Sequence, residues 1–187
     1  GTDGCVGKKY SALALHNALA ARGAAATFRA TGQTGIMIAG GGIPMDAVVS
    51  DFLSGAAEML SPDAAPDHWD VIEGQGSLFH PAYAAVTLGL IHGSQPDAMV
   101  LCHAVGRTVI DEYDDYAVPD LRDCVAQYEQ AARVTNDQAR VVGISLNTEG
   151  LDDAGALSAC DEVSTLTGLA CADPMRHPLD PIIDALP

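Results

Sequence analysis

The chain has 187 residues, of which 48% are hydrophobic and 18% charged, enough for one domain with a sizeable core. Nine lysines and arginines stand against 25 aspartates and glutamates, a formal net charge of −16, and such a surface repels nucleic acid and anionic lipid. No apolar run approaches the roughly 20 residues that cross a bilayer, and the five cysteines form no Cys-x-x-Cys pair. We therefore expect a cytoplasmic protein with reduced thiols that binds neither nucleic acid nor membranes.

The chain opens with a glycine-rich segment, Gly1-Thr2-Asp3-Gly4-Cys5-Val6-Gly7-Lys8-Lys9, that runs straight into a predicted helix. Glycines allow a tight turn in which successive N–H groups point at one phosphate, and the helix N-terminus adds its positive end. Lys8 and Lys9 are the only lysines of this acidic chain, which favours a bound anion here. The alternatives are an ordinary helix start and a chance pair of surface lysines.

The rest of the chain alternates helical patterns with short apolar runs. In chain order we expect a helix at Lys8–Arg22 ended by Gly23, a strand at Ala25–Arg29, a helix at Pro44–Leu60, a strand at Trp69–Ile72, a helix at Tyr83–Ile91, a strand at Ala98–Cys102, a loop and helix start at Asp111–Asp123, a helix at Leu121–Arg133, a strand at Val141–Leu146, a helix at Leu151–Leu166, a short strand at Leu169–Ala172 and a helical turn at Pro181–Leu186. This alternation implies a mainly parallel sheet covered by helices on both faces.

A phosphate-binding loop normally follows a strand, but here the loop comes first. We therefore predict a three-layer α/β P-loop fold that forms a single domain over residues 1–187. Its first strand, usually a central one, is missing, and we interpret the chain as a fragment of a longer protein.

The spacing of the loop differs from the common G-x-x-x-x-G-K-[ST] pattern, because five residues separate Gly1 from Gly7 and Lys9 replaces the hydroxyl. The form G-T-D-x-x-V-G-K resembles dethiobiotin synthetase and its P-loop relatives. Trp69–Gly76 likewise resembles the E-G-x-G strand end of that group, with Glu73 as the acid, and Val141–Asn147 resembles its strand with base or cofactor contacts. Ligands gather outside the carboxyl ends of parallel strands, so Glu73 and the loop are expected to converge.

Lys9 stands where phosphoryl-transfer P-loop enzymes have a hydroxyl that binds Mg²⁺. Two unit charges about 4 Å apart repel by roughly 4 kcal/mol at an intermediate effective dielectric, which weakens a metal site. Asp3 and Glu73 are the residues left to hold Mg²⁺ if it is used. A loop with two lysines and no hydroxyl is better suited to binding a diphosphate than to cleaving one. This pattern predicts a site that binds a phosphorylated carrier.

Further motifs make the resemblance specific: Ala30–Ile38 with T-G-Q-T-G, Val71–Pro81 with E-G-Q-G-S-L-F-H-P, Gly93–Ala98, Cys102-His103 and Arg107-Thr108. Together with the loop they resemble the D-glutamate N-acetyltransferase family, long described as a domain of unknown function. The resemblance implies acetyl transfer from acetyl-CoA to the amino group of D-glutamate or a related D-amino acid, with the CoA diphosphate in the loop. It also implies that an N-terminal Rossmann-like domain and the first P-loop strand lie outside this chain.

Acetyl transfer needs a base for the substrate ammonium and donors for the oxyanion. Glu73 is the first candidate base, and its alternative roles are holding a metal or capping the Gly74–Gly76 turn. His103 and His80 are the other candidates, each against a structural role. An acetylated Cys5 is a further alternative.

The cofactor contacts implied for the loop and the later strand are Thr2, Asp3, Gly4, Cys5, Val6, Gly7, Lys8, Lys9 and Asn147. For the acceptor we expect Arg107 to pair with a carboxylate, with an ordinary surface arginine as the alternative. Thr31, Gln33 and Thr34 are expected to contact the acceptor from the loop after Ala25–Arg29.

Two other functions stay open. One is an ATP- and Mg²⁺-dependent ligase or kinase similar to dethiobiotin synthetase, and the other is a non-catalytic nucleotide-binding regulatory module. No residue reads the chirality of the acceptor, and a homo-oligomer is an open alternative to a monomer.

Overall fold

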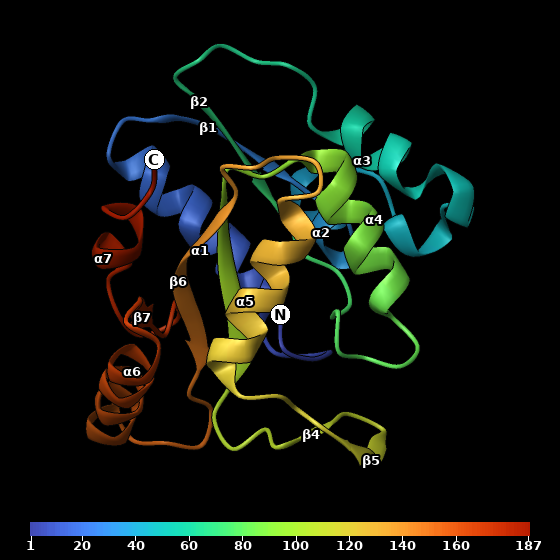
Figure 1. Cartoon of the computed structure of the whole chain (residues 1–187). Coiled ribbons are helices and arrows are strands. Elements are labelled where there is room, and N and C mark those ends of the chain that lie inside the picture. Colours follow the sequence, from blue (N-terminus) through green and yellow to red (C-terminus); the bar gives the residue numbers. More distant parts are fainter.

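The computed structural model describes residues 1–187 (Figure 1). The elements are α1 Lys8–Ala21, β1 Ala25–Arg29, α2 Gln33–Ala39, the 3₁₀ turns η1 Met45–Ala47 and η2 Ser50–Phe52, α3 Leu53–Leu60, β2 His68–Ile72, α4 Ala84–Ser94, β3 Ala98–Ala104, β4 Val109–Ile110, β5 Tyr113–Ala117, α5 Leu121–Ala132, β6 Arg140–Asn147, α6 Asp153–Thr167, β7 Ala170–Ala172 and α7 Asp180–Ile183. No helix has both the length and the apolar character that a bilayer-spanning segment requires.

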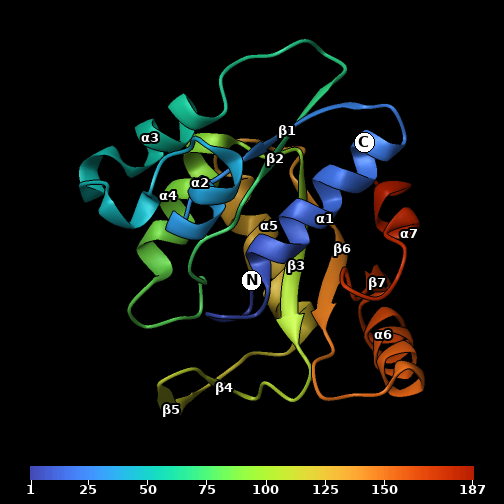
Figure 2. The same cartoon turned by 180° about the vertical axis from the view of Figure 1, so that it is seen from behind.

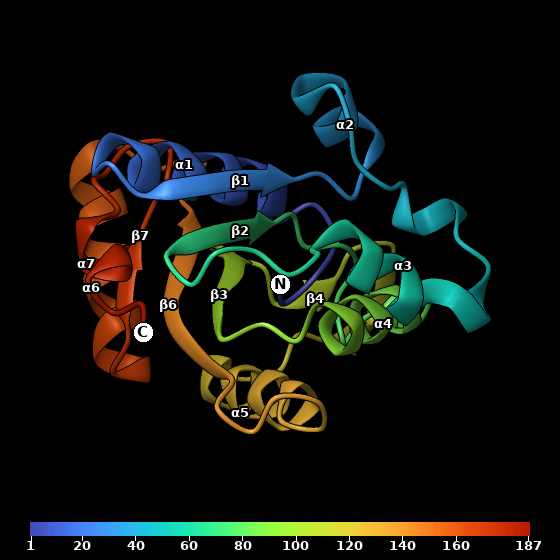
Figure 3. The ribbon, with the colours of Figure 1, turned by 90° about the horizontal axis from the view of Figure 1, so that it is seen from above.

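The strands form parallel ladders with helices on either side, as the alternation of the sequence predicts. β1 pairs with β2, and β3 pairs with β6, which pairs with β7. In the view from above, α1 covers one face of these strands and α5 covers the other (Figure 3). α6 and α7 lie along the β7 end (Figure 2). The mainly parallel α/β prediction is confirmed, but the sheet consists of two separate pieces.

The core follows these layers. One buried cluster joins β3 and β6 to α5 and includes Leu101, Ile144 and Tyr128. A second joins α1 to α7 and β7 through Leu19 and Ile182. These contacts hold the strand ends, and therefore the loops that follow them, at fixed positions.

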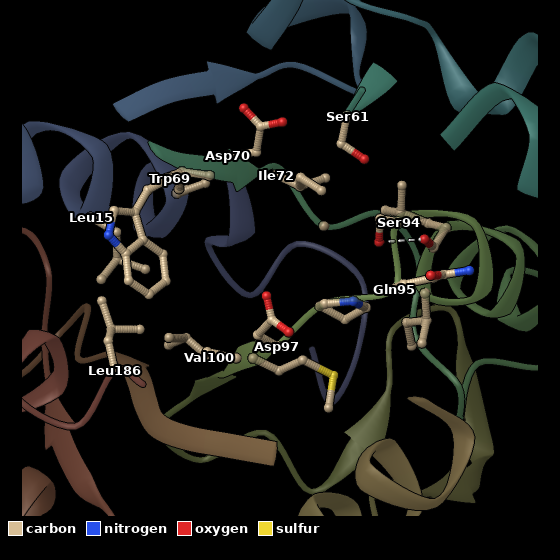
Figure 4. Close-up of a pocket in the computed structure, with 18 of the residues that line it drawn as sticks. Leu15, Ser61, Trp69, Asp70, Ile72, Ser94, Gln95, Asp97, Val100 and Leu186 are labelled. Atoms are coloured by element: carbon tan, nitrogen blue, oxygen red, sulfur yellow. Dashed lines mark hydrogen bonds between the residues drawn. The ribbon is translucent and has the colours of Figure 1, made fainter. Parts of the chain in front are cut away.

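A cavity of about 790 Å³ separates the two pieces of the sheet, between β2 and β3. Apolar side chains line it, including Leu15, Trp69, Val100 and Leu186 (Figure 4). The single backbone hydrogen bond to the facing edge of β3 is donated by the Thr2 N–H to the Cys102 carbonyl at 2.9 Å. A slot between two strand edges has the shape of one further strand, and Gly1, just before Thr2, lines it. The missing central strand stays a prediction, and this slot is where it fits.

The predicted helix at Pro44–Leu60 is wrong in its first half. Only Leu53–Leu60 is α-helical, after the two 3₁₀ turns. Val48 and Val49 between these turns are extended, with ψ of 134° at both. β-Branched side chains favour this conformation, and it interrupts the helical pattern.

The expected loop after β1 is also wrong beyond Thr31, because Gln33 and Thr34 open the helix α2. This helix contains Gly35, a poor helix former, and Gly40 follows its last residue in the left-handed conformation. In Figure 3, α2 stands apart from the body of the protein.

The acidic segment Asp111–Asp123 is not entirely a loop, since Tyr113–Ala117 forms β5 and pairs antiparallel with β4. Glu112 at the turn has φ of 64°. Asp114 and Asp115 are exposed, so the expected solvated character holds for the acidic side chains.

We expect a strand supplied to the slot to stabilise the protein. Adding Val-Ile-Val-Leu-Ile directly before Gly1 should raise the free energy of unfolding by several kcal/mol, because each buried aliphatic side chain contributes about 1.5–3 kcal/mol against the entropy of ordering it. Urea unfolding followed by circular dichroism measures the difference. A Gly-Ser-Glu-Ser-Gly extension is the matched control, and equal stability of the two would contradict the assignment of the slot.

Candidate functional site

The predicted phosphate loop is a nest of backbone amides at the start of α1. Cys5 has φ of 50° and Gly7 has φ of 96°, so both adopt the left-handed conformation that turns successive N–H groups to one side. No amide from Cys5–Tyr10 donates a hydrogen bond within the protein. These free donors lie at the positive end of a 14-residue helix, an arrangement that favours a bound anion.

Lys8 is folded onto this loop. Its Nζ donates to the Asp3 carbonyl at 2.8 Å, and its side chain packs against Gly74, where an added Cβ would lie 3.4 Å from Lys8 Cδ. Burial lowers the pKa of Lys8, because the ammonium has lost part of its hydration. An incoming anion would restore the missing stabilisation.

Lys9 has a different partner. Its Nζ lies 4.9 Å from the centre of the Tyr10 ring, a cation–π contact. Tyr10 is 53% exposed. The structure therefore brings Lys8 onto the loop as predicted, and places the Lys9 ammonium on a neighbouring surface ring.

Asp3 is fully buried, and both oxygens of its carboxylate accept hydrogen bonds from donors of the protein. Oδ1 accepts from the Gly4 N–H at 2.6 Å, and Oδ2 accepts from Arg107 Nη1 at 2.9 Å and from the Asp111 N–H at 2.8 Å. Arg107 Nη1 also lies 3.2 Å from Asp111 Oδ1. Arg107 thus comes to the loop, but its guanidinium is already paired with two acids of the protein.

Glu73 lies at the end of β2, on the other flank of the loop, and is likewise held by backbone donors. Its buried Oε2 accepts from the Thr31 N–H at 3.0 Å and the Gly32 N–H at 3.1 Å. A Cβ at position 35 would clash with this oxygen, so Gly35 allows the carboxylate to lie against α2. Glu73 therefore anchors the start of α2, and the predicted capping of the Gly74–Gly76 turn is not what the carboxylate does.

The Thr31 hydroxyl both donates and accepts a hydrogen bond within the protein. Its Oγ1 donates to the Glu73 carbonyl at 2.6 Å and accepts from Gln75 Nε2 at 3.0 Å. Gln33 and Thr34 differ, since both are exposed at the start of α2. Of the three predicted acceptor contacts on this segment, only these two have side chains open to a ligand.

His103, in β3, lies beside the loop. Its Nδ1 and Thr2 Oγ1 share a hydrogen bond of 2.8 Å. Burial, and secondarily the positive charge of Arg107, lowers the pKa of His103 from its ordinary value of 6.5. The imidazole is therefore neutral near pH 7, with Nε2 available.

His80 is buried and held by aromatic neighbours. Its Nδ1 accepts from the Ala82 N–H at 3.1 Å, and its ring lies 4.3 Å from the Tyr83 ring and 5.2 Å from the Tyr113 ring. These contacts join β5 to the segment after β2. The structure does not bring His80 into contact with the loop.

Tyr128 in α5 was not identified from the sequence. Its Oη donates to the Gly1 carbonyl at 2.7 Å and accepts from the Gly1 nitrogen at 3.0 Å and the Leu78 N–H at 3.3 Å. Burial raises the pKa of its phenol. The sequence places Tyr128 in a predicted helix, but it does not predict the hydrogen-bond partners of the hydroxyl.

Asn147 ends β6 and lines a second cavity, of about 280 Å³, together with Val6 and Gly7 of the loop. Its Oδ1 accepts from the Glu149 N–H at 3.0 Å. The structure thus places this predicted cofactor contact next to the loop, on the flank away from Glu73.

The chain is similar to proteins of one family over nearly its whole length. Residues 1–183 match the family model described as "Domain of unknown function (DUF1611_C) P-loop domain". The chain is 49% identical over 186 residues to a D-glutamate N-acetyltransferase of Tritonibacter scottomollicae, covering 100% of this chain and 56% of that protein. It is 48% identical over 183 residues to one of Pseudoalteromonas sp., covering 98% and 55%.

A crystal structure of a DUF1611 family protein from Anabaena variabilis has the same fold, with a TM-score of 0.93 and 41% identity. The match covers 99% of this chain and 55% of that one. The chain therefore spans about half the length of the relatives that it matches.

The packing of Glu73 against α2 makes a testable prediction. Gly35→Ala should lower the free energy of unfolding by about 1–3 kcal/mol, the usual cost of overpacking, because the new Cβ displaces the carboxylate. Gly55→Ala is the matched helical control, since its Cβ meets nothing within 4 Å and should stabilise α3 by about 0.5–1 kcal/mol. Chemical denaturation measures both, and similar effects at the two positions would refute this contact.

Proposed function

The chain belongs to the DUF1611 P-loop family, and on that premise we propose that it is the coenzyme-binding domain of an N-acetyltransferase acting on D-glutamate or a related D-amino acid. The observation that carries the proposal is the run of unpaired amides at Cys5–Tyr10 with Lys8 folded over it. This arrangement fits the diphosphate of acetyl-CoA, an anion that needs several donors but no chemistry at phosphorus.

Acetyl-CoA, when bound, supplies an activated acetyl thioester, and the protein has to deprotonate the acceptor ammonium. We assign this step to His103, whose neutral imidazole can take a proton at Nε2 while Nδ1 stays on Thr2. The amine nitrogen then bonds to the acetyl carbon and the C–S bond breaks. His103 returns its proton to the departing thiolate, and a second ammonium proton leaves the tetrahedral adduct to solvent. Glu73 suits the role less, because its Oε2 already accepts hydrogen bonds from two backbone N–H groups.

Gln33 and Thr34 are the acceptor contacts that we retain, because their side chains are exposed at the start of α2, directly after the Gly32 amide that donates to Glu73. Arg107 instead holds the loop through Asp3. Since the relatives are about twice as long as this chain, we also propose that a second domain completes the acceptor site.

The ligase or kinase alternative needs Mg²⁺ on Asp3 and Glu73. Both oxygens of Asp3 and the Oε2 of Glu73 already accept hydrogen bonds from the protein. Lys9 also removes the hydroxyl ligand of a phosphoryl-transfer loop. The donor set therefore fits a metal-independent grip on a diphosphate better than a metal-dependent transfer.

Titration calorimetry with CoA, ATP and GTP, each with and without Mg²⁺, tests the proposal. We expect metal-independent binding of CoA, and a Lys8→Ala variant should bind CoA about tenfold or more weakly, since charge-assisted hydrogen bonds contribute about 1.5–3 kcal/mol. Lys9→Ala is the adjacent control and should change the affinity less, because its ammonium lies on Tyr10. ATP binding that requires Mg²⁺ would favour the ligase or kinase instead, and nucleotide binding that only changes the oligomeric state would favour a regulatory module.

The role of His103 predicts a pH profile. Because its pKa lies below 6.5 in the folded protein, the base stays unprotonated at neutral pH, and kcat/KM for acetyl transfer should fall only below about pH 6.5. His103→Gln should remove this acid limb and lower kcat by about 10²-fold or more. His16→Gln, in the middle of α1, is the control. An unchanged profile in His103→Gln would exclude His103 as the base.

A further inference from the structure

The second cavity, of about 280 Å³, adjoins the loop on the flank formed by the ends of β6 and β7. It is open at the unpaired amides, since Val6 and Gly7 belong to both. Its walls are Val6, Gly7, Tyr10, Ser11, Ser145, Asn147, Glu149, Asp173, Pro174, Met175 and Arg176. A ligand held by the loop can therefore extend into this cavity without crossing a wall.

The walls combine a few apolar side chains with polar ones, among which the Asn147 amide is a directional donor. Tyr10 and Met175 are 53% and 69% exposed, and Pro174 lies next to Met175. Asn147 uses Oδ1 to accept from the Glu149 N–H, which leaves its Nδ2 without a partner. Large apolar side chains and one amide suit a flat heteroaromatic ring with acceptor nitrogens.

Arg176 is the only cation among the residues that line the cavity. Its Nη1 lies 3.2 Å from Asp153 Oδ1, whose side chain is 97% exposed. An ion pair to so exposed a carboxylate contributes little to stability. The guanidinium can exchange this partner for a phosphate, which it matches in bidentate geometry.

The cavity also has two carboxylates, and one of them, Asp173, forms a second and longer ion pair with Arg176. Asp173 is buried and accepts from the Thr148 N–H, the Thr148 hydroxyl and the Met175 N–H. Its Oδ2 is 3.8 Å from Arg176 Nε, beyond a hydrogen bond. Glu149 is exposed at the rim, where solvent screens it.

We propose that this cavity takes the adenosine 3′-phosphate end of the coenzyme and that Arg176 pairs with the 3′-phosphate, so that the protein distinguishes CoA from dephospho-CoA; this rests on the proposed function. A coenzyme whose diphosphate lies on the loop carries its next phosphate one ribose away. Arg176, the only cation of this otherwise acidic wall, is the group that binds this phosphate. The adenine ring then lies against Tyr10, Pro174 or Met175, with Asn147 donating to a ring nitrogen.

Calorimetric titration of the protein with CoA and with dephospho-CoA tests this inference. The unmodified protein should bind CoA about tenfold or more tightly than dephospho-CoA, the effect of one charge-assisted contact. Arg176→Gln should weaken CoA binding to the level of dephospho-CoA and leave dephospho-CoA unchanged. Arg122→Gln is the control, because Arg122 pairs with Asp120 at the start of α5 and does not line the cavity.

The outcomes separate the two proposals. Equal affinity for CoA and dephospho-CoA, or a loss in Arg176→Gln that is the same for both, would overturn the role of Arg176. If Lys8→Ala still weakened both ligands, the grip of the loop would stand. Absence of CoA binding to the unmodified protein would overturn both. Arg176→Lys should recover part of the preference, because it keeps the charge without the planar fork.

Discussion

A run of backbone amides without partners is the feature on which the rest of this site depends. Unpaired N–H groups cost free energy unless water or a ligand meets them, and here they cluster at the start of α1 in a chain with a net charge of −16. The two buried carboxylates that flank the loop, Asp3 and Glu73, would repel an anion if their charge were exposed. Internal donors occupy them instead. Asp3 pairs with Arg107, and Glu73 Oε2 accepts from two backbone N–H groups, so groups of the protein itself compensate part of this negative charge.

The loop is also coupled to the slot between β2 and β3. Gly1 and Lys8 line one end of that cavity, and Tyr128 holds both backbone groups of Gly1 from α5. The Thr2 N–H donates to the Cys102 carbonyl on the edge of β3. A strand placed in the slot would join the amide nest at Gly1.

The predicted site residues divide according to whether the fold leaves their polar groups free. The loop and Glu73 converge, as expected from strand ends that share one edge of a sheet, and His103 joins them through Thr2. Arg107 and Thr31 also arrive, but their hydrogen-bonding groups are used within the protein. His80 is held among tyrosines instead. Residue type and spacing predict which side chains come near the site, whereas their availability depends on partners distant in the chain.

The sequence by itself determined the alternation of strands and helices, the parallel sheet, the position of the phosphate loop and the family, because each of these rests on local periodicity or on a short motif. It did not reveal α2, because Gly35 within it disfavours a helix. The amides that precede this helix donate to Glu73, some 40 positions away. Nor did it reveal Tyr128 or the cavity walls at Arg176. Only the tertiary structure decided which donors meet which acceptors, because such pairs join residues that are far apart in the chain and no local pattern records them.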